Sequence, residues 1–286
     1  MVVIYLRDRL GNQLFQIAFG YAVAKKLNKK LYFFGDIQSE LLHVNKHFKN
    51  LNINILPIVE YNKFSAKRNK TFFNRIGISK YYLQYNELEF SYCPISDNIK
   101  TPILFKGFWQ SPLYFSGYEK DILELFEINN QNLNELSLGY LKKIQLTTSV
   151  AIHIRRGDYI SSATNLQKHG ICDKVYYNKS IDLLNATISN LKYFIFTDDP
   201  NWALEHMQFP NAEIVLTKNQ GENAWQDMFL MSSCNHQIIA NSSFSWWAAW
   251  LNKNENKLVI APKIWFADAK FNDATTGLIP KSWIRL

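Results

Sequence analysis

The stretch that decides the fold runs from Ser149 to Tyr159 and reads Ser-Val-Ala-Ile-His-Ile-Arg-Arg-Gly-Asp-Tyr. Its first six residues form a short, mainly apolar run that is typical of a buried strand. Gly157 lets the chain turn directly after this strand, so that charged side chains gather at its carboxyl end. Such a strand is typical of a parallel sheet, whose ligands lie at the carboxyl ends of the strands.

The rest of the second half repeats the pattern of strand and helix. Short apolar runs predict strands at residues 193–197, 212–216, 237–240 and 257–261, and apolar residues at helical spacing predict helices at 177–188, 202–207, 224–233 and 244–251. Strands that alternate with helices form a parallel sheet covered on both faces, with right-handed crossovers. The second half is therefore predicted to be a Rossmann-like domain.

The first half begins in the same way and then loses its regularity. Strands are expected at Val2–Leu6, Leu31–Phe34 and Ile103–Phe105, and helices from about Leu14 to Asn28 and at Tyr118–Phe126. Between residues 36 and 100 the chain is rich in Asn and Lys and shows no firm period. We therefore expect an α/β protein with two Rossmann-like domains facing across a cleft, namely residues 1–140, with an irregular insertion at about 36–100, and residues 141–286.

Composition narrows the class of function. The 286 residues are 47% hydrophobic and carry a net charge of +8, which suits a folded protein with an anionic partner. No Lys/Arg block is dense enough for a nucleic-acid arm, and no uncharged apolar run reaches roughly 18 residues. We expect a cytoplasmic protein, with peripheral association at the inner membrane as an alternative.

Three widely spaced cysteines, Cys93, Cys172 and Cys234, disfavour a disulfide framework and a zinc site.

Two adjacent arginines follow the 149–154 strand. Side chains alternate along a strand, so His153 and Arg155 are expected on the same face. A guanidinium group binds phosphate oxygens through paired, charge-assisted hydrogen bonds, and Arg155 and Arg156 therefore suit a diphosphate. The alternative is that one of them pairs with Asp158 and only pins the turn.

The next strand is followed by Thr197-Asp198-Asp199-Pro200. Asp199 before a proline is typical of a helix N-cap, which leaves Asp198 for a ligand or for a partner arginine. Because the pair is adjacent and differs from the Asp-x-Asp sequence of many metal-dependent transferases, we expect no metal.

The strand that ends at Ala240 runs into Asn241-Ser242-Ser243-Phe244-Ser245-Trp246-Trp247. A helix N-terminus at this place offers free N–H groups and hydroxyl groups that form a cradle for an anion. Simple N-capping by Ser243 is the alternative, and the tryptophans are expected to pack the helix. Near the start of the chain, Gly11-Asn12-Gln13 lies between a strand and a helix without the spacing of a dinucleotide-binding or P-loop motif.

Together these segments resemble the motifs of the α-1,2-fucosyltransferases, glycosyltransferase family 11. The resemblance rests on His153–Tyr159, Phe196–Pro200 and Asn241–Trp247, in this order and spacing, and is supported by Gly11–Gln16 and Gly107–Ser111. It covers most of the chain except about residues 36–100. Asp8 and Arg9 stand where the family usually has two glycines, so either the acceptor preference or the shape of the loop at residues 7–13 is expected to differ.

The resemblance implies a GT-B fold and transfer of L-fucose from GDP-β-L-fucose to O2 of a terminal β-galactoside. It also implies inversion at the anomeric carbon, no metal and no other cofactor. Residues 141–286 would bind GDP-fucose, and residues 1–140 would lie on the acceptor side. Nucleic acid is not implied as a partner, and the oligomeric state stays open.

The same resemblance assigns roles to individual residues. The catalytic residues would be Arg155 at the β-phosphate and His153 beside the nucleotide. The general base follows from position and not from the resemblance: Asp158 is the preferred catalytic base, and His153 and Asp8 are the other candidates. Asp227 would bind guanine, unless it is only a surface carboxylate. The other donor-binding residues would be Arg156, Asp198, Asn241, Ser242, Ser243, Phe244, Gly11, Asn12 and Gln13, and the acceptor-side residues would be Trp109 and Gln110.

Two other functions stay open at this point. A fucosyltransferase of another linkage, such as α-1,6 transfer to N-acetylglucosamine, would differ mainly in the N-terminal domain. A basic protein that binds nucleic acid or a membrane surface belongs to another class and would need arginines interleaved with aromatic residues on one sheet face. Two arginines at a strand end beside an acidic residue suit a pocket better.

Overall fold

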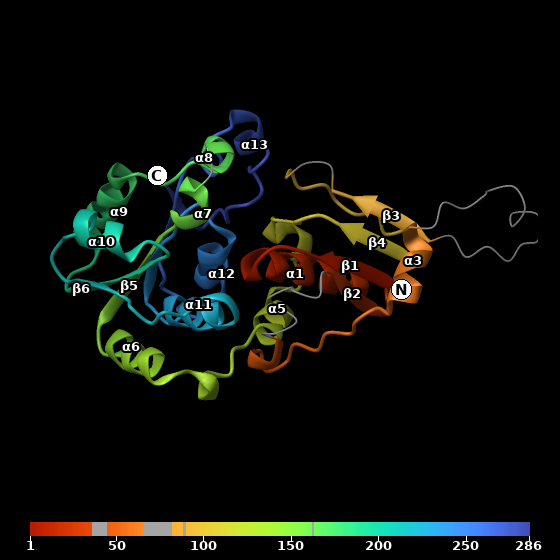
Figure 1. Cartoon of the computed structure of the whole chain (residues 1–286), viewed down its shortest axis with the longest axis horizontal. Coiled ribbons are helices and arrows are strands. Elements are labelled where there is room, and N and C mark those ends of the chain that lie inside the picture. Colours follow the sequence, from red (N-terminus) through yellow and green to blue (C-terminus); the bar gives the residue numbers. More distant parts are fainter. Residues whose placement is uncertain (36–44, 66–81, 88–89, 162) are drawn as a thin grey trace, which may run out of the picture.

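The computed structural model contains two parallel sheets that lie side by side (Figure 1). It describes residues 1–35, 45–65, 82–87, 90–161 and 163–286. Each sheet is the centre of one domain: the strands of the N-terminal sheet precede residue 107, and those of the C-terminal sheet follow residue 147.

The N-terminal domain has four parallel strands in the order β2-β1-β4-β3. Their bounds are β1 Val2–Leu6, β2 Leu31–Gly35, β3 Leu83–Asn86 and β4 Ile103–Lys106. β1 is covered on both faces, because Val2 and Ile4 belong to one hydrophobic cluster with helix α1 (Leu10–Lys26) and Val3 to another with Phe64 of α3 (Ile58–Ser65). This double burial explains the continuous apolar run at the start of the sequence.

The C-terminal domain has six parallel strands in the order β10-β9-β8-β5-β6-β7. Their bounds are β5 Thr148–Ile154, β6 Leu191–Thr197, β7 Ala212–Ile214, β8 His236–Ile238, β9 Val259–Ala261 and β10 Ile284–Arg285. Read from β7, this is the strand order 3-2-1-4-5-6 of the dinucleotide-binding Rossmann fold. The predicted Rossmann-like architecture of the second half is therefore confirmed.

The remaining helices cover the sheets and connect them. They are α5 Glu119–Leu125, α6 Glu135–Gln145, α7 Gly157–Ile160, α8 Ala163–His169, α9 Lys174–Thr187, α10 Pro200–His206, α11 Ala224–Ser232, α12 Ser243–Leu251 and α13 Ala269–Asp273, with 3-10 helices at 45–47, 112–115, 130–132 and 221–223.

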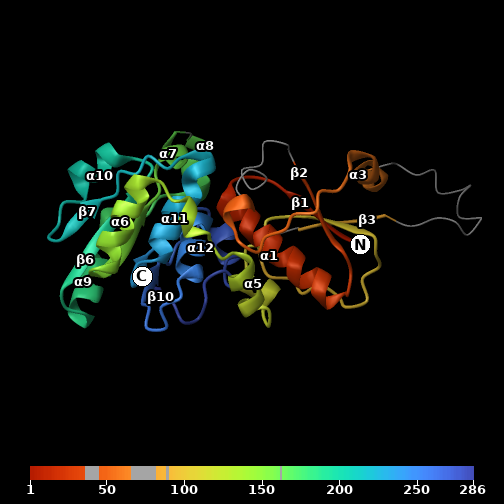
Figure 2. The same cartoon turned by 90° about the horizontal axis from the view of Figure 1, so that it is seen from below.

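One hydrophobic cluster extends across both domains. Helices α1 and α12 pack together at its centre, as Figure 2 shows. The ring of Phe15 on α1 lies 4.4 Å from that of Trp246 and 4.9 Å from that of Trp247, measured between ring centroids. Both tryptophans are fully buried, which confirms that they pack the helix rather than face a sugar. The domains are thus joined by a shared core.

The structure differs from the sequence prediction at several places, among them the short helices α7, α8 and α13, which were not predicted. β3 lies in the region without a firm period and pairs in parallel with β4, so that this region adds an edge strand and α3 to the domain. β10 is only two residues long and was not predicted, because two residues carry no periodic signal. The predicted division between residues 140 and 141 falls inside α6, which packs against α11 and β5.

Candidate active site

Each sheet has one place where the strand order reverses, and ligands of open α/β sheets bind there, at the carboxyl ends of the strands. This place lies between β1 and β4 in the N-terminal sheet and between β5 and β8 in the C-terminal sheet. The segments that follow these strands are residues 7–9, 107–110, 155–157 and 239–242. They contain six of the fifteen candidate site residues, namely Trp109, Gln110, Arg155, Arg156, Asn241 and Ser242.

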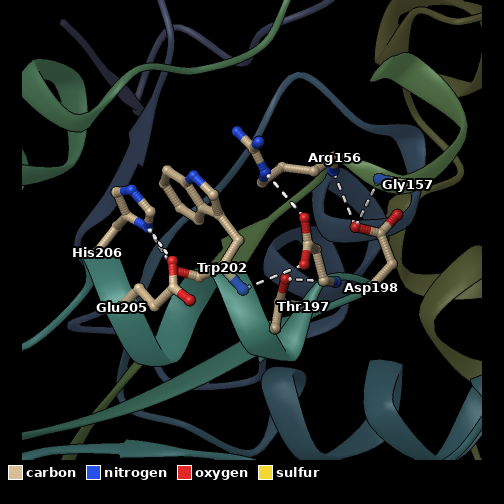
Figure 3. A network of polar contacts seen from close by, with 8 residues as sticks. Arg156, Gly157, Thr197, Asp198, Trp202, Glu205 and His206 are labelled. Carbon is tan, nitrogen blue, oxygen red and sulfur yellow. Dashed lines mark hydrogen bonds and ion pairs between the residues drawn. The ribbon is translucent and has the colours of Figure 1, made fainter. Parts of the chain in front are cut away.

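Both arginines after β5 bind acidic side chains at the end of β6. Arg155 Nη1 lies 2.8 Å from Asp198 Oδ2, and Arg156 Nε lies 3.2 Å from Asp199 Oδ2. Asp198 Oδ1 also accepts hydrogen bonds from the backbone N–H groups of Arg156 and Gly157, at 2.8 and 3.1 Å (Figure 3). A single carboxylate therefore holds the turn after β5 and one of its arginines.

The two arginines have different neighbours. Arg156 lies over the ring of Trp202 on α10, with 4.1 Å from its guanidinium carbon to the ring centroid (Figure 3). Arg155 lies 5.6 Å from the ring centroid of Tyr159 on α7. Asp199 accepts a hydrogen bond from Trp202 N and caps α10, which confirms the predicted N-cap. Arg156 thus ties α10 to the sheet, whereas Arg155 lies beside the α7 turn.

Asp158 was the alternative partner for these arginines and the preferred general base. Its backbone lies in α7, but its side chain is outside the described part of the structure. The partners that the structure does place beside the two arginines are Asp198 and Asp199. The role of Asp158 as a base stays a prediction.

His153 is buried at the carboxyl end of β5, where only 5% of it is exposed. Its ring centroid lies 5.7 Å from that of Phe244 on α12, and its Nδ1 atom is buried without a hydrogen-bond partner. Burial lowers the pKa of His153 to about 4, although the negative charge of Asp198 opposes this shift. The imidazole is therefore neutral near pH 7 and is a weak base.

The first turn of α12 corrects one sequence interpretation. Ser242, and not Ser243, caps this helix, because Ser242 Oγ accepts a hydrogen bond from Phe244 N at 3.3 Å. Ser243 Oγ instead donates to Asn12 Oδ1 at 2.8 Å. The helix end is capped on one side and bound to the N-terminal domain on the other.

Two amides that were predicted to bind the donor support the site from behind. Asn241 Nδ2 donates to the carbonyl oxygens of His169 and Trp265, at 2.9 and 3.1 Å. Gln13 Nε2 donates to the carbonyl oxygen of Asp8. Asn241 is 3% exposed and Gln13 is fully buried, and both side chains fix loops beside the site. Their direct contact with the donor stays a prediction.

Gly11 is required for the close approach of α1 to α12. A Cβ atom at this position would lie 2.6 Å from Phe244 N and 2.8 Å from Ser243 Oγ. Asn12 follows and accepts hydrogen bonds from Ser243 Oγ and from Gln110 Nε2, the latter at 2.7 Å. Just before the helix, Asp8 has a φ of 67°, in the left-handed region that glycine favours, which agrees with the glycine usual in the family here.

Asp227 lies in the first turn of α11, near the carboxyl end of β7. Its Oδ1 atom accepts hydrogen bonds from Thr217 Oγ1 and Asn219 Nδ2, both at 2.7 Å. Burial raises the pKa of Asp227, and these two hydrogen bonds oppose the shift. The carboxylate is thus half-buried and held in a fixed orientation, unlike an ordinary surface carboxylate. Thr217 and Asn219 were not predicted. The signal that could have found them is their place, as polar residues, directly after a strand.

Trp109 and Gln110 were expected on the acceptor side, and both are buried. Trp109 is 1% exposed and stacks on Phe19 of α1, with 4.0 Å between the ring centroids. Gln110 is 8% exposed and binds Asn12. The N-terminal core takes up the ring of Trp109, and the acceptor-side role of both residues stays a prediction.

Glu87 was missed by the sequence analysis and follows β3 at the same edge of the sheet. Its carboxylate accepts hydrogen bonds from Phe108 N at 2.5 Å and from Trp109 N at 3.0 Å. A Cβ atom at Gly107 would lie 2.5 Å from Glu87 Cβ, so that glycine is needed for this approach. Burial raises the pKa of Glu87, and the two N–H groups oppose the shift. The alternating sequence Leu83-Gln84-Tyr85-Asn86 is the signal that could have placed a strand before it.

A line of aromatic rings joins the two domains at this edge. In order, it consists of Tyr159, His169, Phe266, Phe90 and Phe108, with neighbouring ring centroids 4.7, 5.4, 5.0 and 5.7 Å apart. Arg7 lies over the last ring at 4.1 Å. These rings run from the α7 turn in the C-terminal domain to the loop after β4 in the N-terminal domain.

Other features lie outside the site. A cavity of about 360 Å³, lined in part by Glu127, Cys234 and Asn252, lies on the opposite side, near the amino end of β8. Among the described residues, no group of three or more His, Cys, Asp and Glu side chains is arranged to hold a metal ion. Within the same residues, no helix combines the length and apolar character needed to cross a membrane. Cys93 is exposed, while Cys172 is half-buried and Cys234 buried.

Comparison with known proteins decides the family. A family model described as Glycosyl transferase family 11 matches residues 1–286. The chain belongs to this family. It is 34% identical to an α-1,2-colitosyltransferase of Escherichia coli, over all of this chain and 99% of that protein. It is 28% identical to the O-antigen biosynthesis glycosyltransferase WbnK of Escherichia coli, over 98% of this chain and 99% of that protein.

More distant matches include a mammalian enzyme and a solved structure. The galactoside 2-α-L-fucosyltransferase Sec1 of Mus musculus is 26% identical over 88% of this chain and 64% of that protein. The crystal structure of NodZ α-1,6-fucosyltransferase soaked with GDP-fucose matches with a TM-score of 0.51 at 14% identity, over 87% of this chain and 92% of that chain. The expected GT-B-like fold and the resemblance to family 11 are both confirmed.

Proposed function

We propose that the chain transfers L-fucose from GDP-β-L-fucose to O2 of a terminal β-galactoside, with inversion and without a metal. One observation carries the proposal. Arg155 and the N-terminus of α12 lie at the carboxyl ends of β5 and β8, which flank the place where the strand order reverses. A guanidinium group and a helix N-terminus at the same edge of a sheet suit the binding of a nucleotide diphosphate.

The proposed reaction is one in-line displacement. The acceptor O2 attacks C1 of fucose, the bond between C1 and the β-phosphate oxygen breaks, and GDP leaves with the bonding electrons. Asp158 takes the proton of the attacking hydroxyl. Arg155 and the first-turn N–H groups of α12 stabilise the charge that develops on the diphosphate. Asp227, held by Thr217 and Asn219, accepts hydrogen bonds from the N–H groups of guanine.

The contacts of the arginines favour an enzyme over a nucleic-acid or membrane-surface protein. Arg155 and Arg156 are each bound to a carboxylate, and their side chains are only 18% and 16% exposed. Arginines that bind a nucleic-acid backbone need an open face instead. Because the bacterial relatives include an O-antigen glycosyltransferase, we place the reaction in the cytoplasm.

A second donor has a specific observation in its favour. The relative with 34% identity over the whole chain is named as an α-1,2-colitosyltransferase. Colitose is L-fucose without its 3-hydroxyl group, so a site for one of these sugars has nearly the right shape for the other. GDP-colitose is therefore the alternative donor, with the same linkage to the acceptor.

Product analysis tests the proposal. The purified protein is incubated with lactose and either GDP-fucose or GDP-colitose, with and without EDTA, and the products are identified by mass spectrometry and NMR. The expected product is 2′-fucosyllactose, at equal yield with EDTA, and GDP-mannose serves as the donor control. A product with colitose alone would change the donor, a 3- or 6-linked product would change the linkage, and turnover with neither donor on a panel of β-galactosides would overturn the proposal.

A further inference from the structure

Asn12 is bound to both sides of the proposed site through a single atom. Its Oδ1 accepts a hydrogen bond from Ser243 Oγ of the C-terminal domain at 2.8 Å and from Gln110 Nε2 of the N-terminal domain at 2.7 Å. A carbonyl oxygen has two lone pairs, so these two donors satisfy it completely. The positions of both donors are therefore tied to that of Asn12.

Each of these donors is the end of a larger fixed element. Ser243 is the first residue of α12. Gln110 ends the loop after β4, in which the N–H groups of Phe108 and Trp109 are held by the carboxylate of Glu87. Hydrogen bonds and the backbone of residues 108–110 thus connect the edge of the N-terminal sheet to the start of the helix that would bind the diphosphate.

The hydrogen bond to Asn12 also limits what Ser243 can do. A hydroxyl group has one proton, and Ser243 donates its proton to Asn12. While this bond holds, Ser243 Oγ offers only lone pairs to the site, and these repel a phosphate oxygen. The diphosphate must then be bound by backbone N–H groups of α12, whose place is set by the contact with Asn12.

We propose that Asn12 is a positioning residue that couples the loop at residues 107–110 to the N-terminus of α12. A change in this loop, on the acceptor side, then alters the affinity for the donor nucleotide although the loop does not touch it. The inference rests on the proposed function, because it takes α12 as the diphosphate site. Coupling of this kind would link the arrangement of the acceptor side to the occupancy of the donor side.

The test is a double-mutant cycle on the full chain, with the dissociation constant of GDP measured by calorimetry. Gln110→Leu should weaken GDP binding about fivefold, the change expected from one neutral hydrogen bond. Asn12→Ala should weaken it by a similar factor, and Gln110→Leu should then add nothing. Ser111→Ala is the matched control, because Ser111 Oγ donates to the carbonyl of Gly277 at 2.7 Å, another contact between the domains that does not involve Asn12. GDP affinity should not change in this variant.

Additive effects in the cycle, or unchanged GDP affinity in Gln110→Leu, would overturn the inference while leaving the proposed function intact. A wild-type chain that binds no GDP would overturn both. Circular dichroism checks that each variant is folded. If Asn12→Ala does not fold, Ser243→Ala replaces it, because it removes the other end of the same connection and should equally abolish the effect of Gln110→Leu.

Discussion

The two arginines after β5 allow a sharp test of the site, because they are adjacent, carry the same charge and each bind one aspartate. Replacing Arg155 by Ala removes a guanidinium group beside the α7 turn, where the diphosphate is proposed to bind. A hydrogen bond to a charged group is worth about 1.5–3 kcal/mol. With one tenfold change for each 1.36 kcal/mol, kcat/KM should fall about 10- to 150-fold for one such bond, and further if the arginine binds two oxygens.

Arg156→Ala should behave differently. The backbone N–H of residue 156 still donates to Asp198, so that the turn is kept. The side chain loses its place over Trp202 and its ion pair with Asp199. A cation–π contact is worth about 0.5–2 kcal/mol, and a partly exposed ion pair about 1 kcal/mol or less. The unfolding free energy should therefore fall by about 1–2 kcal/mol, while kcat/KM stays within about threefold of the wild type.

The assay measures GDP release at limiting GDP-fucose for the wild type and both variants, and urea denaturation gives their stabilities. Together they separate loss of chemistry from loss of folded protein. Near-wild-type turnover of Arg155→Ala would refute the assignment of the diphosphate to this arginine. A larger loss of turnover in Arg156→Ala than in Arg155→Ala would exchange their roles.

Three further variants test the packing and the electrostatics. Gly11→Ala should lower the unfolding free energy, measured by urea denaturation, by about 2–3 kcal/mol, because the new Cβ would lie 2.6 Å from the backbone nitrogen of Phe244. An unchanged midpoint of the denaturation curve would contradict this contact. Trp109→Ala should lower the unfolding free energy by about 3–5 kcal/mol, because its buried ring stacks on Phe19. A loss of acceptor binding at full stability would contradict this structural role and support the acceptor-side role. The pKa of His153 is about 4 in the folded chain and 6.5 in the unfolded chain. Between these pH values the unfolded state binds one more proton than the folded state. The unfolding free energy of the wild type is therefore lost as the pH falls from 6.5 towards 4. His153→Gln should remove this dependence of the unfolding free energy on pH. Urea denaturation at several pH values measures it, and an equal pH dependence in the wild type and the variant would exclude a buried neutral imidazole.

Most strands and four helices of the C-terminal domain could be predicted from local sequence to within a few residues, whereas β10 and the short helices α7, α8 and α13 could not. Its strands are buried on both faces, so each is a short apolar run that ends in polar residues, and its helices show a clear period. The N-cap at Asp199 was equally local, since the carboxylate and the N–H that it binds are three residues apart. Strand β3 was not predicted, because an edge strand with alternating polar residues differs little from its Asn-rich surroundings.

By itself, the sequence determined which polar residues follow the strands, and their order placed the chain in its family. Only the tertiary structure decided what those residues bind. Ser243 donates to a residue 231 positions away, and Arg156 binds a carboxylate 43 positions away. Trp109 turned inward because a helix at the start of the chain offered Phe19 as a stacking partner. Local sequence sets the direction of the chain and the type of each side chain, but hydrogen-bond partners depend on the packing of segments that are distant in sequence.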